Sequence, residues 1–360
     1  MSVEIWREPW RGGFADPRMF LLPGDLRNLA AERGRWPAAP LARLTGMEFA
    51  GYDEHETSWK QPVTGWLLSS QGLVPGGLLG VVADFALGSV VGPALPPRTL
   101  FSTSEMSFNF LRAATLESRE ITAVGRLIGV DGRLALSECD LLDADGRELA
   151  LVTCRNVIGD QLPETEPGPD PGDQAAVDAF IESLAIPPAD EHELPDPYLR
   201  PPAGEVLGAD AWKAGGLAVL RGQLAGEVPH PPIHHLLGVR PTAAEVGEVR
   251  FAMPASGWLA SGFGSVEGGF LAFLAYSALA SAVQTTTAPG VTHVPVDLKI
   301  NFLRPVYPDP GLGDLTAVGR VVHRGRTLSV ADAEVFGVDG RKVAIGRGTS
   351  MFLAGDGGAG

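Results

Sequence analysis

The sequence contains two copies of one pattern, separated by 192 residues. In this register Gly46 coincides with Gly238, and three longer matches follow without a gap: Gly65-Trp66-Leu67 with Gly257-Trp258-Leu259, Gly76-Gly77 with Gly268-Gly269, and Asn109-Phe110-Leu111-Arg112 with Asn301-Phe302-Leu303-Arg304. We place the repeats at about 20–158 and 210–355. Two domains of one fold are therefore expected, an N-terminal domain at 1–158 and a C-terminal domain at 210–360.

Residues 159–209, between the copies, differ in composition from both. From Gly159 to Arg200 there are eleven acidic residues and one basic residue, so this segment carries −10 of the net charge of −15. Proline-rich stretches flank one short helical pattern, QAAVDAFIESL. We expect an acidic, proline-rich linker. Because the acidity is concentrated there and Lys and Arg are not clustered, nucleic acid is not an expected partner.

Each copy contains an apolar run followed by alternating segments. The runs GGLLGVVADFALGSVV and GGFLAFLAYSALASAV suit a buried helix of about four turns. Alternation of apolar and polar residues then predicts a half-buried strand ending at NFLR, and three more strand-like runs joined by turns follow in each copy. A long helix followed by antiparallel strands predicts an α+β fold in which the sheet curls around the helix.

The apolar runs are shorter than a typical membrane-spanning helix. Their apolar cores are nearer 15 residues than the roughly 20 that span a bilayer, and Gly, Ser and Pro interrupt them. The first 20 residues contain no basic segment followed by an apolar core, so a cytoplasmic location and no membrane partner are expected. Cys139 and Cys154, the two cysteines, fit a reducing compartment.

The order of these motifs resembles that of the hotdog-fold acyl-CoA thioesterases. A Gly-Gly begins the apolar helix, an acid follows in its second to third turn, and the next strand ends in NFLR. The resemblance is closest to the phenylacetate-pathway and 4-hydroxybenzoyl-CoA type, with the thioesterase II group, itself a tandem hotdog, as a near relative. It covers both repeats and implies a tandem hotdog, in which two curled antiparallel sheets each wrap a long central helix to form a pseudo-dimer.

The two copies depart from the family pattern in different ways. The resemblance implies a His-Gly-Gly with an acid nine residues after the His. Here Asp84 is nine residues after Pro75 of Pro75-Gly76-Gly77, whereas Glu267-Gly268-Gly269 is followed at that distance by Tyr276. The first copy therefore keeps the acid and lacks the His, and the second lacks both.

The family site lies between two subunits, so the resemblance implies that Asp84 faces Gly268 and Gly269 of the other copy. Tyr276, facing Gly76 and Gly77, would form a site without a carboxylate, so one competent site per chain is expected. The resemblance also implies that Thr103 holds the attacking water and that Ser261 contacts the carbonyl or the water. Glu267, in the place of the family His, would orient water beside Asp84.

These residue types suit thioester hydrolysis. The reaction needs an activated water or a carboxylate nucleophile, together with donors for the oxyanion. Helix-terminal N–H groups are such donors, and glycine lets a carbonyl approach them closely. Asp84 would activate water or attack the carbonyl, Gly268 would stabilise the oxyanion, and two close carboxylates would raise one pKa.

Structural interpretations remain open for the same residues. Asp84 can be a buried carboxylate satisfied by backbone N–H groups, Thr103 a strand residue, and Glu267 an acid stabilised by the helix dipole. The small residues around Asp84 can leave room for a substrate or let two helices pack closely. Arg112 and Arg304, at the strand ends, can contact the phosphates of coenzyme A or be ordinary surface residues.

We therefore interpret the chain as a thioester hydrolase that acts on a small-molecule acyl-CoA, with no cofactor beyond the coenzyme A of the substrate. A homodimer of pseudo-dimers is a further expectation. No metal site is expected, because His230, His234 and His235 lack a second ligand cluster and prolines interrupt their helix. The alternatives are a non-catalytic hotdog that binds an acyl-CoA or an acyl carrier, and a double-hotdog hydratase or dehydratase.

Overall fold

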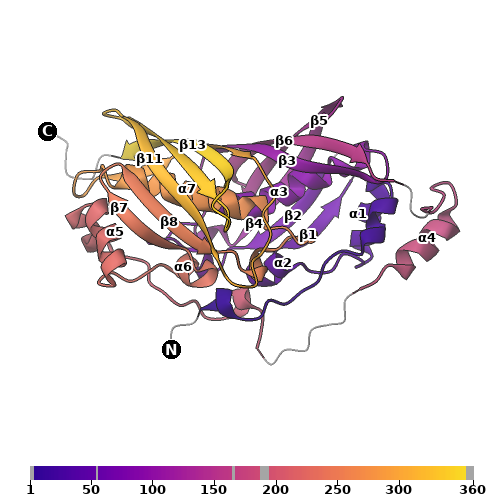
Figure 1. Cartoon of the computed structure of the whole chain (residues 1–360), viewed down its shortest axis with the longest axis horizontal. Helices are drawn as coiled ribbons and strands as arrows, with labels where there is room; N and C mark the ends of the chain where they lie inside the picture. Colours follow the sequence, from indigo (N-terminus) through magenta and orange to yellow (C-terminus); the bar gives the residue numbers. More distant parts are fainter. Residues whose placement is uncertain (1–3, 54–55, 164–166, 187–193, 354–360) are drawn as a thin grey trace.

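The computed structural model describes residues 4–53, 56–163, 167–186 and 194–353. Small parts of both predicted domains (1–3, 54–55 and 354–360) and two parts of the predicted linker (164–166 and 187–193) lie outside the described residues. The described chain is an α+β protein in which central helices lie against one long antiparallel sheet, as predicted. Figure 1 shows its two halves side by side.

The first half has two strands before its central helix and four strands after it. Its strands are β1 (Glu48–Tyr52), β2 (Glu56–Pro62), β3 (Thr99–Phe110), β4 (Glu120–Asp131), β5 (Leu134–Asp143) and β6 (Glu148–Gln161). Its α-helices are α1 (Gly24–Glu32), α2 (Pro40–Thr45) and α3 (Gly80–Ser89), and the 3-10 helix η4 (Gly76–Leu79) leads into α3. Further 3-10 turns are η2 (Pro17–Leu21), η3 (Gly65–Leu67), η5 (Gly92–Ala94) and η6 (Leu116–Ser118).

The second half repeats this order. Its strands are β7 (Arg240–Glu245), β8 (Glu248–Pro254), β9 (Thr292–Pro295), β10 (Asp297–Phe302), β11 (Asp314–Arg324), β12 (Leu328–Phe336) and β13 (Lys342–Leu353). Its helices are α5 (Gly216–Ala225), α6 (Pro232–Leu237) and α7 (Gly268–Gln284), with 3-10 turns η8 (Ala209–Ala214) and η9 (Gly257–Leu259). A displacement of 192 carries the starts of α1 and α2 onto those of α5 and α6, so the equivalence includes these outer helices.

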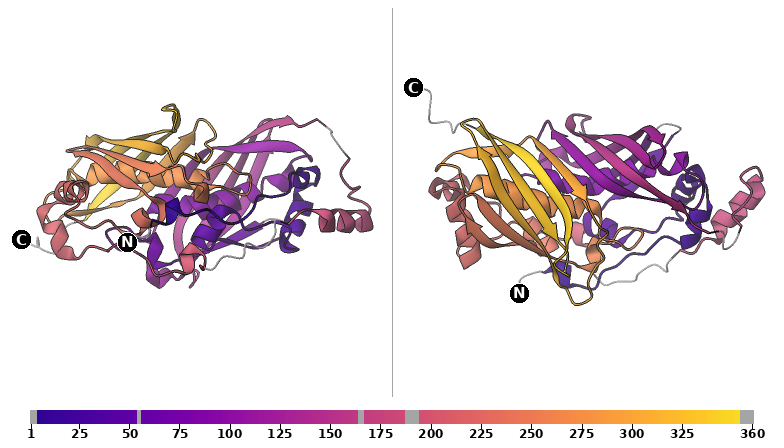
Figure 2. Two further views of the ribbon diagram at one scale, coloured as in Figure 1. Left: turned by 60° about the horizontal axis from the view of Figure 1, so that its bottom comes forward. Right: turned by 45° about the horizontal axis from the view of Figure 1, so that its top comes forward.

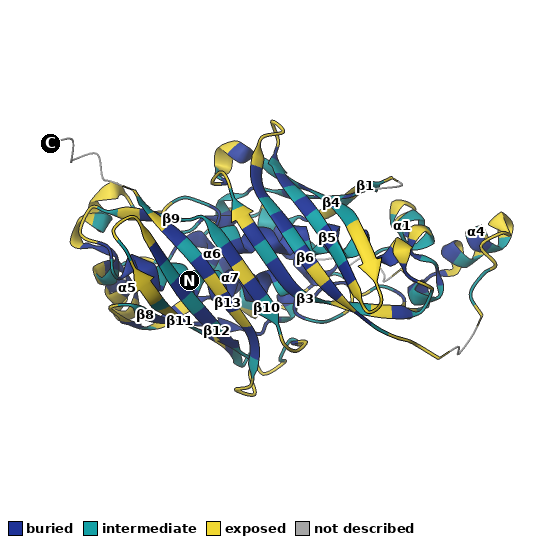
Figure 3. Ribbon diagram, turned by 90° about the horizontal axis from the view of Figure 1, so that it is seen from above, coloured by how far each residue is buried: buried dark blue, intermediate teal, exposed yellow. Residues whose placement is uncertain are grey.

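The sheet is continuous across the two halves. Its strand order is β1-β2-β4-β5-β6-β3-β10-β13-β12-β11-β8-β7, with β9 also paired to β13. The halves join at β3 and β10, where Met106 pairs with Ile300 in antiparallel register. Figure 3 shows alternating burial along the strands, which in β5 runs without a break from Ala135 to Asp143. One face of the sheet therefore covers the core, as the alternation in the sequence predicted.

The central helices α3 and α7 lie against that face and contact each other (Figure 2). Glycines bring their backbones together: a Cβ on Gly269 would lie 2.2 Å from the backbone N of Val81, and one on Gly77 would lie 2.7 Å from the carbonyl O of Ala272. Close packing is therefore one function of the small residues on these helices. The two halves share one hydrophobic core as a result.

The apolar stretch Gly76–Ala94 is long and apolar enough to cross a bilayer by length and composition. In the structure 67% of that window is buried inside the protein. Ala83, Ala86 and Leu87 of α3 have no exposed surface. Its hydrophobicity is accounted for by its position between the sheet and α7.

Two equivalent segments cross between the halves, and we call them the crossed arms: residues 5–12, which include η1 (Ile5–Arg7), and residues 197–204, which include η7 (Pro197–Leu199). The first arm packs on the second half, where the indole N–H of Trp258 donates to the carbonyl of Glu8 at 3.0 Å. The second arm packs on the first half, where the indole N–H of Trp66 donates to the carbonyl of Arg200 at 2.8 Å. Each buried Trp is thus covered by the arm that precedes the other half.

A small second core lies at the outer edge of the first half. The helical pattern predicted within the linker is α4 (Gln174–Ser183), with Asp173 as its N-cap. Val177 and Ile181 of α4 pack against Met19, Leu22 and Ala30, which precede or lie in α1. The linker therefore holds α1 and the preceding turn in place.

Candidate active site

The Asp84 carboxylate lies in the middle of α3 and accepts a hydrogen bond from Thr103. The Thr103 Oγ1 on β3 lies 2.7 Å from Asp84 Oδ1. The neighbouring residues of α3 are apolar, because this helix is covered by the sheet on one side and by α7 on the other. Asp84 is half-buried and lines a cavity of about 760 Å³, which we call the acid cavity.

The second half contributes the N-terminus of α7 to the same place. A Cβ on Gly268 would lie only 2.7 Å from Asp84 Oδ2, so the close approach requires glycine at this position. The first N–H groups of a helix have no acceptor within the helix and carry partial positive charge. The structure therefore brings a carboxylate of one half against a set of oxyanion donors from the other.

Glu267 precedes α7 as its N-cap and lies beside Asp84. Its side chain makes no capping bond to its own helix, and it hydrogen-bonds Asp84 instead. Burial raises the pKa of Glu267 well above its usual value, and the charge of Asp84 raises it further. Burial also raises the pKa of Asp84, whereas the hydrogen bonds from Glu267 and Thr103 lower it. The two carboxyl groups therefore titrate as a coupled pair, in which the rise in pKa is stronger for Glu267 than for Asp84.

A buried residue that sequence analysis missed, Asn156 of β6, orients Thr103. Its Nδ2 lies 3.3 Å from Thr103 Oγ1, and the thiol of Cys154 lies 3.5 Å from its Oδ1, which fixes the orientation of the amide. Because the Thr103 hydroxyl accepts from Asn156, its proton points to Asp84. The one signal in the sequence was a polar residue at an inward-facing position of a strand.

We expect Asn156→Ala to lower kcat about 10-fold with little change in KM, because Thr103 loses the bond that orients it. The Thr103 bond lowers the pKa of Asp84, so the acid limb of the pH–rate profile should move to higher pH. Ser350→Ala is the matched control. Ser350 pairs with Pro295 as Asn156 pairs with Thr103, and its buried hydroxyl has no hydrogen-bond partner in the described part of the chain. Equal profiles for Asn156→Ala and the wild type would contradict the positioning role.

Two further predicted residues, Ser261 and Arg304, line the acid cavity, whereas Gly269 does not. Ser261 is buried, and its Oγ lies 3.3 Å from that of Ser265. Arg304 is exposed at the rim. Gly269 is instead buried in the contact between α3 and α7, against Gly80 and Val81. Its predicted contact with the substrate, through the backbone, stays a prediction.

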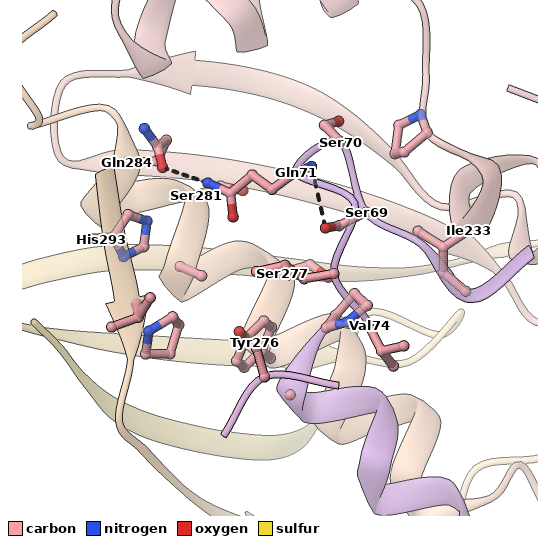
Figure 4. A pocket seen from close by; sticks show the side chains of 18 of the residues that line it. Ser69, Ser70, Gln71, Val74, Ile233, Tyr276, Ser277, Ser281, Gln284 and His293 are labelled. Atoms are coloured by element: carbon pink, nitrogen blue, oxygen red, sulfur yellow. Dashed lines mark hydrogen bonds between the residues drawn. The ribbon is translucent and has the colours of Figure 1, made fainter. Parts of the chain in front are cut away.

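The equivalent place in the other copy, which we call the mirror cavity, measures about 500 Å³ (Figure 4). Here Tyr276 replaces Asp84, Pro75 replaces Glu267 and Pro295 replaces Thr103. Gly76 lines the cavity next to the Tyr276 ring, whereas Gly77 lies in the helix contact. No carboxylate is among the described residues that line the mirror cavity.

The mirror cavity offers uncharged polar groups. Burial raises the pKa of Tyr276 to about 12, partly offset by the backbone N–H of Gly76, so its hydroxyl is neutral. Figure 4 shows Gln71 reaching Gln284, with Nε2 and Oε1 3.5 Å apart. Arg112 lies at the exposed edge, where it donates to the carbonyl of Glu148 at 2.9 Å. Tyr276 and the two glutamines cannot deprotonate water at neutral pH. The imidazoles of His234 and His293 also line the cavity, and both are neutral because burial lowers their pKa, that of His293 to about 4.

The histidine cluster of the sequence does form a contact. Pro231 and Pro232 begin α6 rather than interrupt it, and His230 Nδ1 lies 3.1 Å from His234 Nδ1. The expectation that the prolines keep these rings apart is therefore wrong. Across the part of the chain that the structure describes, no group of three or more His, Cys, Asp and Glu residues could hold a metal ion.

Comparison with a family model identifies the second half. Residues 263–344, which include Gly268 and most of the following strands, match the model described as the thioesterase superfamily. The match spans less than half of the chain. No curated protein sequence matches the chain.

Solved structures match nearly the whole chain. A proposed thioesterase from Novosphingobium aromaticivorans is 13% identical and has a TM-score of 0.51, over 85% of this chain and 98% of its own. The acyl-CoA thioesterase II TesB2 of Mycobacterium marinum is 12% identical with a TM-score of 0.50, over 89% of this chain and 99% of its own. At such identities the likeness concerns the fold, and it confirms the predicted tandem arrangement. The chain is therefore a double hotdog, and residues 263–344 of its second half match the thioesterase superfamily model.

Proposed function

We propose that the chain hydrolyses an acyl-CoA thioester to the free acid and coenzyme A, at the acid cavity alone. The observation that carries the proposal is the placement of the Asp84 carboxylate against Gly268, at the start of α7. Acyl transfer needs a base for the attacking water and donors for the carbonyl oxygen. The first half supplies the base, and the second half supplies the donors.

In the proposed reaction the thioester carbonyl oxygen accepts from the N–H groups that begin α7. Asp84 removes a proton from water, and the water oxygen bonds to the carbonyl carbon. The carbon–sulfur bond then breaks, and the proton passes from Asp84 to the departing thiolate. Atoms and charges balance without a further reactant.

Thr103 and Glu267 keep Asp84 ready for this step. The Thr103 hydroxyl donates to Asp84 and accepts from Asn156, so its hydrogen bonds are used in orienting the carboxylate. We therefore assign Thr103 to Asp84 rather than to the attacking water. Glu267 retains its proton and allows Asp84 to ionise beside it.

The paired carboxylates predict a bell-shaped dependence of kcat/KM on pH. The raised pKa of Asp84 places the acid limb above the usual range of an aspartate, because activity requires the ionised form. Activity falls again as pH rises through the raised pKa of Glu267, because a second negative charge forms beside the first. Glu267→Gln keeps a donor and removes the ionisation, so it should lose the alkaline limb and retain the acid limb. An unchanged alkaline limb in this variant would exclude Glu267 as its origin.

The proposal is tested by thiol release from short, long and aromatic acyl-CoAs. The wild type should cleave at least one class with multiple turnovers. Each chain should have one active site. A non-hydrolysable acyl thioether that competes with the substrate should therefore bind with a stoichiometry of one per chain. Failure to cleave any acyl-CoA would reject hydrolysis and favour the non-catalytic binding alternative.

A further inference from the structure

One cation in the wall of the acid cavity has no counter-charge among the residues that the structure describes. Arg27, on α1, lines the cavity, and its Nε and Nη2 are buried without a hydrogen-bond partner. Among the described residues no carboxylate lies within ion-pair distance of Arg27; Asp25 acts on it only through its charge, and the Phe20 ring centroid is 5.9 Å from its Cζ. Burial lowers the pKa of Arg27. An unpaired buried charge is costly, so this position suits an anionic ligand group.

Arg27 lies at the far end of the cavity from the reacting centre. Asp84 and Gly88 lie one turn apart on α3, Gly92 begins η5 beyond the end of that helix, and all three line the cavity. Arg27 Nη1 would lie 4.0 Å from a Cβ on Gly92. Eight residues at the rise of an α-helix correspond to roughly 12 Å between Asp84 and Gly92, beside which Arg27 lies.

The path between these ends is open and apolar. A Cβ on Gly88 would meet only the Phe101 ring, at 3.8 Å, so glycine leaves space along the helix. The side chains that line the middle and the far end include several aromatic residues: Phe20, Trp36, Trp59, Phe85 and Phe101. An acyl group can therefore run along α3 from Gly268 toward Arg27.

A second arginine lies at the other end of the cavity. Arg304 follows β10, and Asn301 of that strand pairs with Glu105, two residues from Thr103. Arg304 is thus near the reacting centre, and it is exposed. The exposed Arg304 suits the phosphates of coenzyme A, which stay hydrated. The guanidinium of Arg27 is partly buried, so it suits an anionic group that the acyl chain carries into the cavity.

We infer that the acyl group of the substrate ends in a carboxylate that pairs with Arg27. This inference rests on the proposed hydrolysis at the acid cavity and names its substrate class: coenzyme A thioesters of dicarboxylic acids, with one carboxyl group free. The thioester carbonyl lies at Gly268, and the free carboxylate lies roughly 12 Å away, beside Gly92 beyond the end of α3. A guanidinium and a carboxylate form a charge-assisted, bidentate pair.

The test compares carboxyl-ended and methyl-ended acyl-CoAs of equal chain length in the thiol-release assay. The wild type should favour the carboxyl-ended substrate in kcat/KM. Arg27→Gln should reduce this preference about 30-fold, which is the range for a hydrogen bond to a charged group. Arg27→Lys should restore part of it. Arg33→Gln is the matched control and should keep the wild-type preference, because Arg33 caps the C-terminus of α1 and pairs with Asp178 at the surface.

Thioesters of pantetheine separate the acyl carboxylate from the phosphates of coenzyme A. If Arg27 binds the acyl carboxylate, Arg27→Gln reduces the preference for carboxyl-ended pantetheine thioesters as well. If Arg27→Gln lowered kcat/KM for coenzyme A thioesters alone, and equally for both acyl types, Arg27 would be assigned to a phosphate and the inference overturned. Equal effects of Arg27→Gln on both acyl types in both series would overturn it too.

Binding distinguishes failure of the inference from failure of the proposed hydrolysis. A carboxyl-ended acyl thioether of coenzyme A is titrated into the wild type and Arg27→Gln in a calorimeter. Weaker binding to Arg27→Gln, with no such difference for the methyl-ended thioether, supports the inference even if no thioester is cleaved. Equal binding of both thioethers to both proteins rejects it, whatever the hydrolysis assay gives.

Discussion

Asp84→Asn is expected to lower kcat for thioester cleavage by about 1,000-fold, the range that a positioned general base contributes. Asparagine has nearly the same shape, and its Oδ1 can still accept from Thr103, which donates to Asp84 at 2.7 Å. It cannot take a proton from water. The fold and substrate binding should therefore persist while the reaction stops, as measured by thiol release and by calorimetric titration with a non-hydrolysable thioether.

The control for Asp84→Asn is another buried carboxylate far from the cavity. Asp143 is 3% exposed and accepts from Arg147 Nε at 2.8 Å. Asp143→Asn removes this ion pair and should lower the thermal midpoint while kcat stays near that of the wild type. If Asp84→Asn retained the full rate, Asp84 would be a structural carboxylate and hydrolysis would need another base.

The largest effect on stability is expected from Gly269→Ala. The added Cβ would lie 2.2 Å from the backbone N of Val81 and 2.4 Å from the carbonyl carbon of Gly80. Both contacts are with backbone atoms, so α3 and α7 must separate. We expect the free energy of unfolding to fall by about 3 kcal/mol, at the upper end for overpacking in a core. The thermal midpoint and a denaturant titration measure the change.

Gly208→Ala is the matched control for that substitution. A Cβ on Gly208 meets nothing within 4 Å, and its φ of −69° suits any residue. Its thermal midpoint should stay close to that of the wild type. A wild-type midpoint for Gly269→Ala would mean that the helices tolerate a wider spacing than the structure shows.

The internal repeat explains why so much of the fold was predictable. Two copies of one pattern limit the chain to two similar units, and the alternation before NFLR predicted the strands β3 and β10 that join them. The pairing of Asp84 with Gly268 was implied by the resemblance to the hotdog thioesterases, whose site lies between two subunits. Placement of these residues could thus be predicted, whereas their chemical roles await the experiments above.

Other features depend on contacts that sequence patterns do not report. The short hairpins β1–β2 and β7–β8 precede the central helices and pair at the two ends of the sheet. Burial alternates along β2, but Thr57 and Gln61 at its buried positions are polar, so the sequence shows no apolar alternation there. Asn156 reaches Thr103 only through the register of β6 with β3. Arg27 reaches the cavity because α1 packs on η5, with Gly24 against Gly92, and because Ala30 of α1 shares a small core with α4.

The crossed arms determine whether the chain can be cut into two separately folded fragments. The linker after β6 leads first into residues 197–204, which cover Trp66 of the half already completed, and only then into the second half. A cut made at the boundary between the two repeated units gives each fragment the arm that belongs on the other. The Glu8 carboxylate and the Arg200 guanidinium, 2.8 Å apart, tie the two arms together where they meet. Neither half is therefore complete without the other, and the smallest unit that keeps both arms in place contains both halves. Two separate chains would have to associate to exchange these arms, whereas here the exchange takes place within one polypeptide.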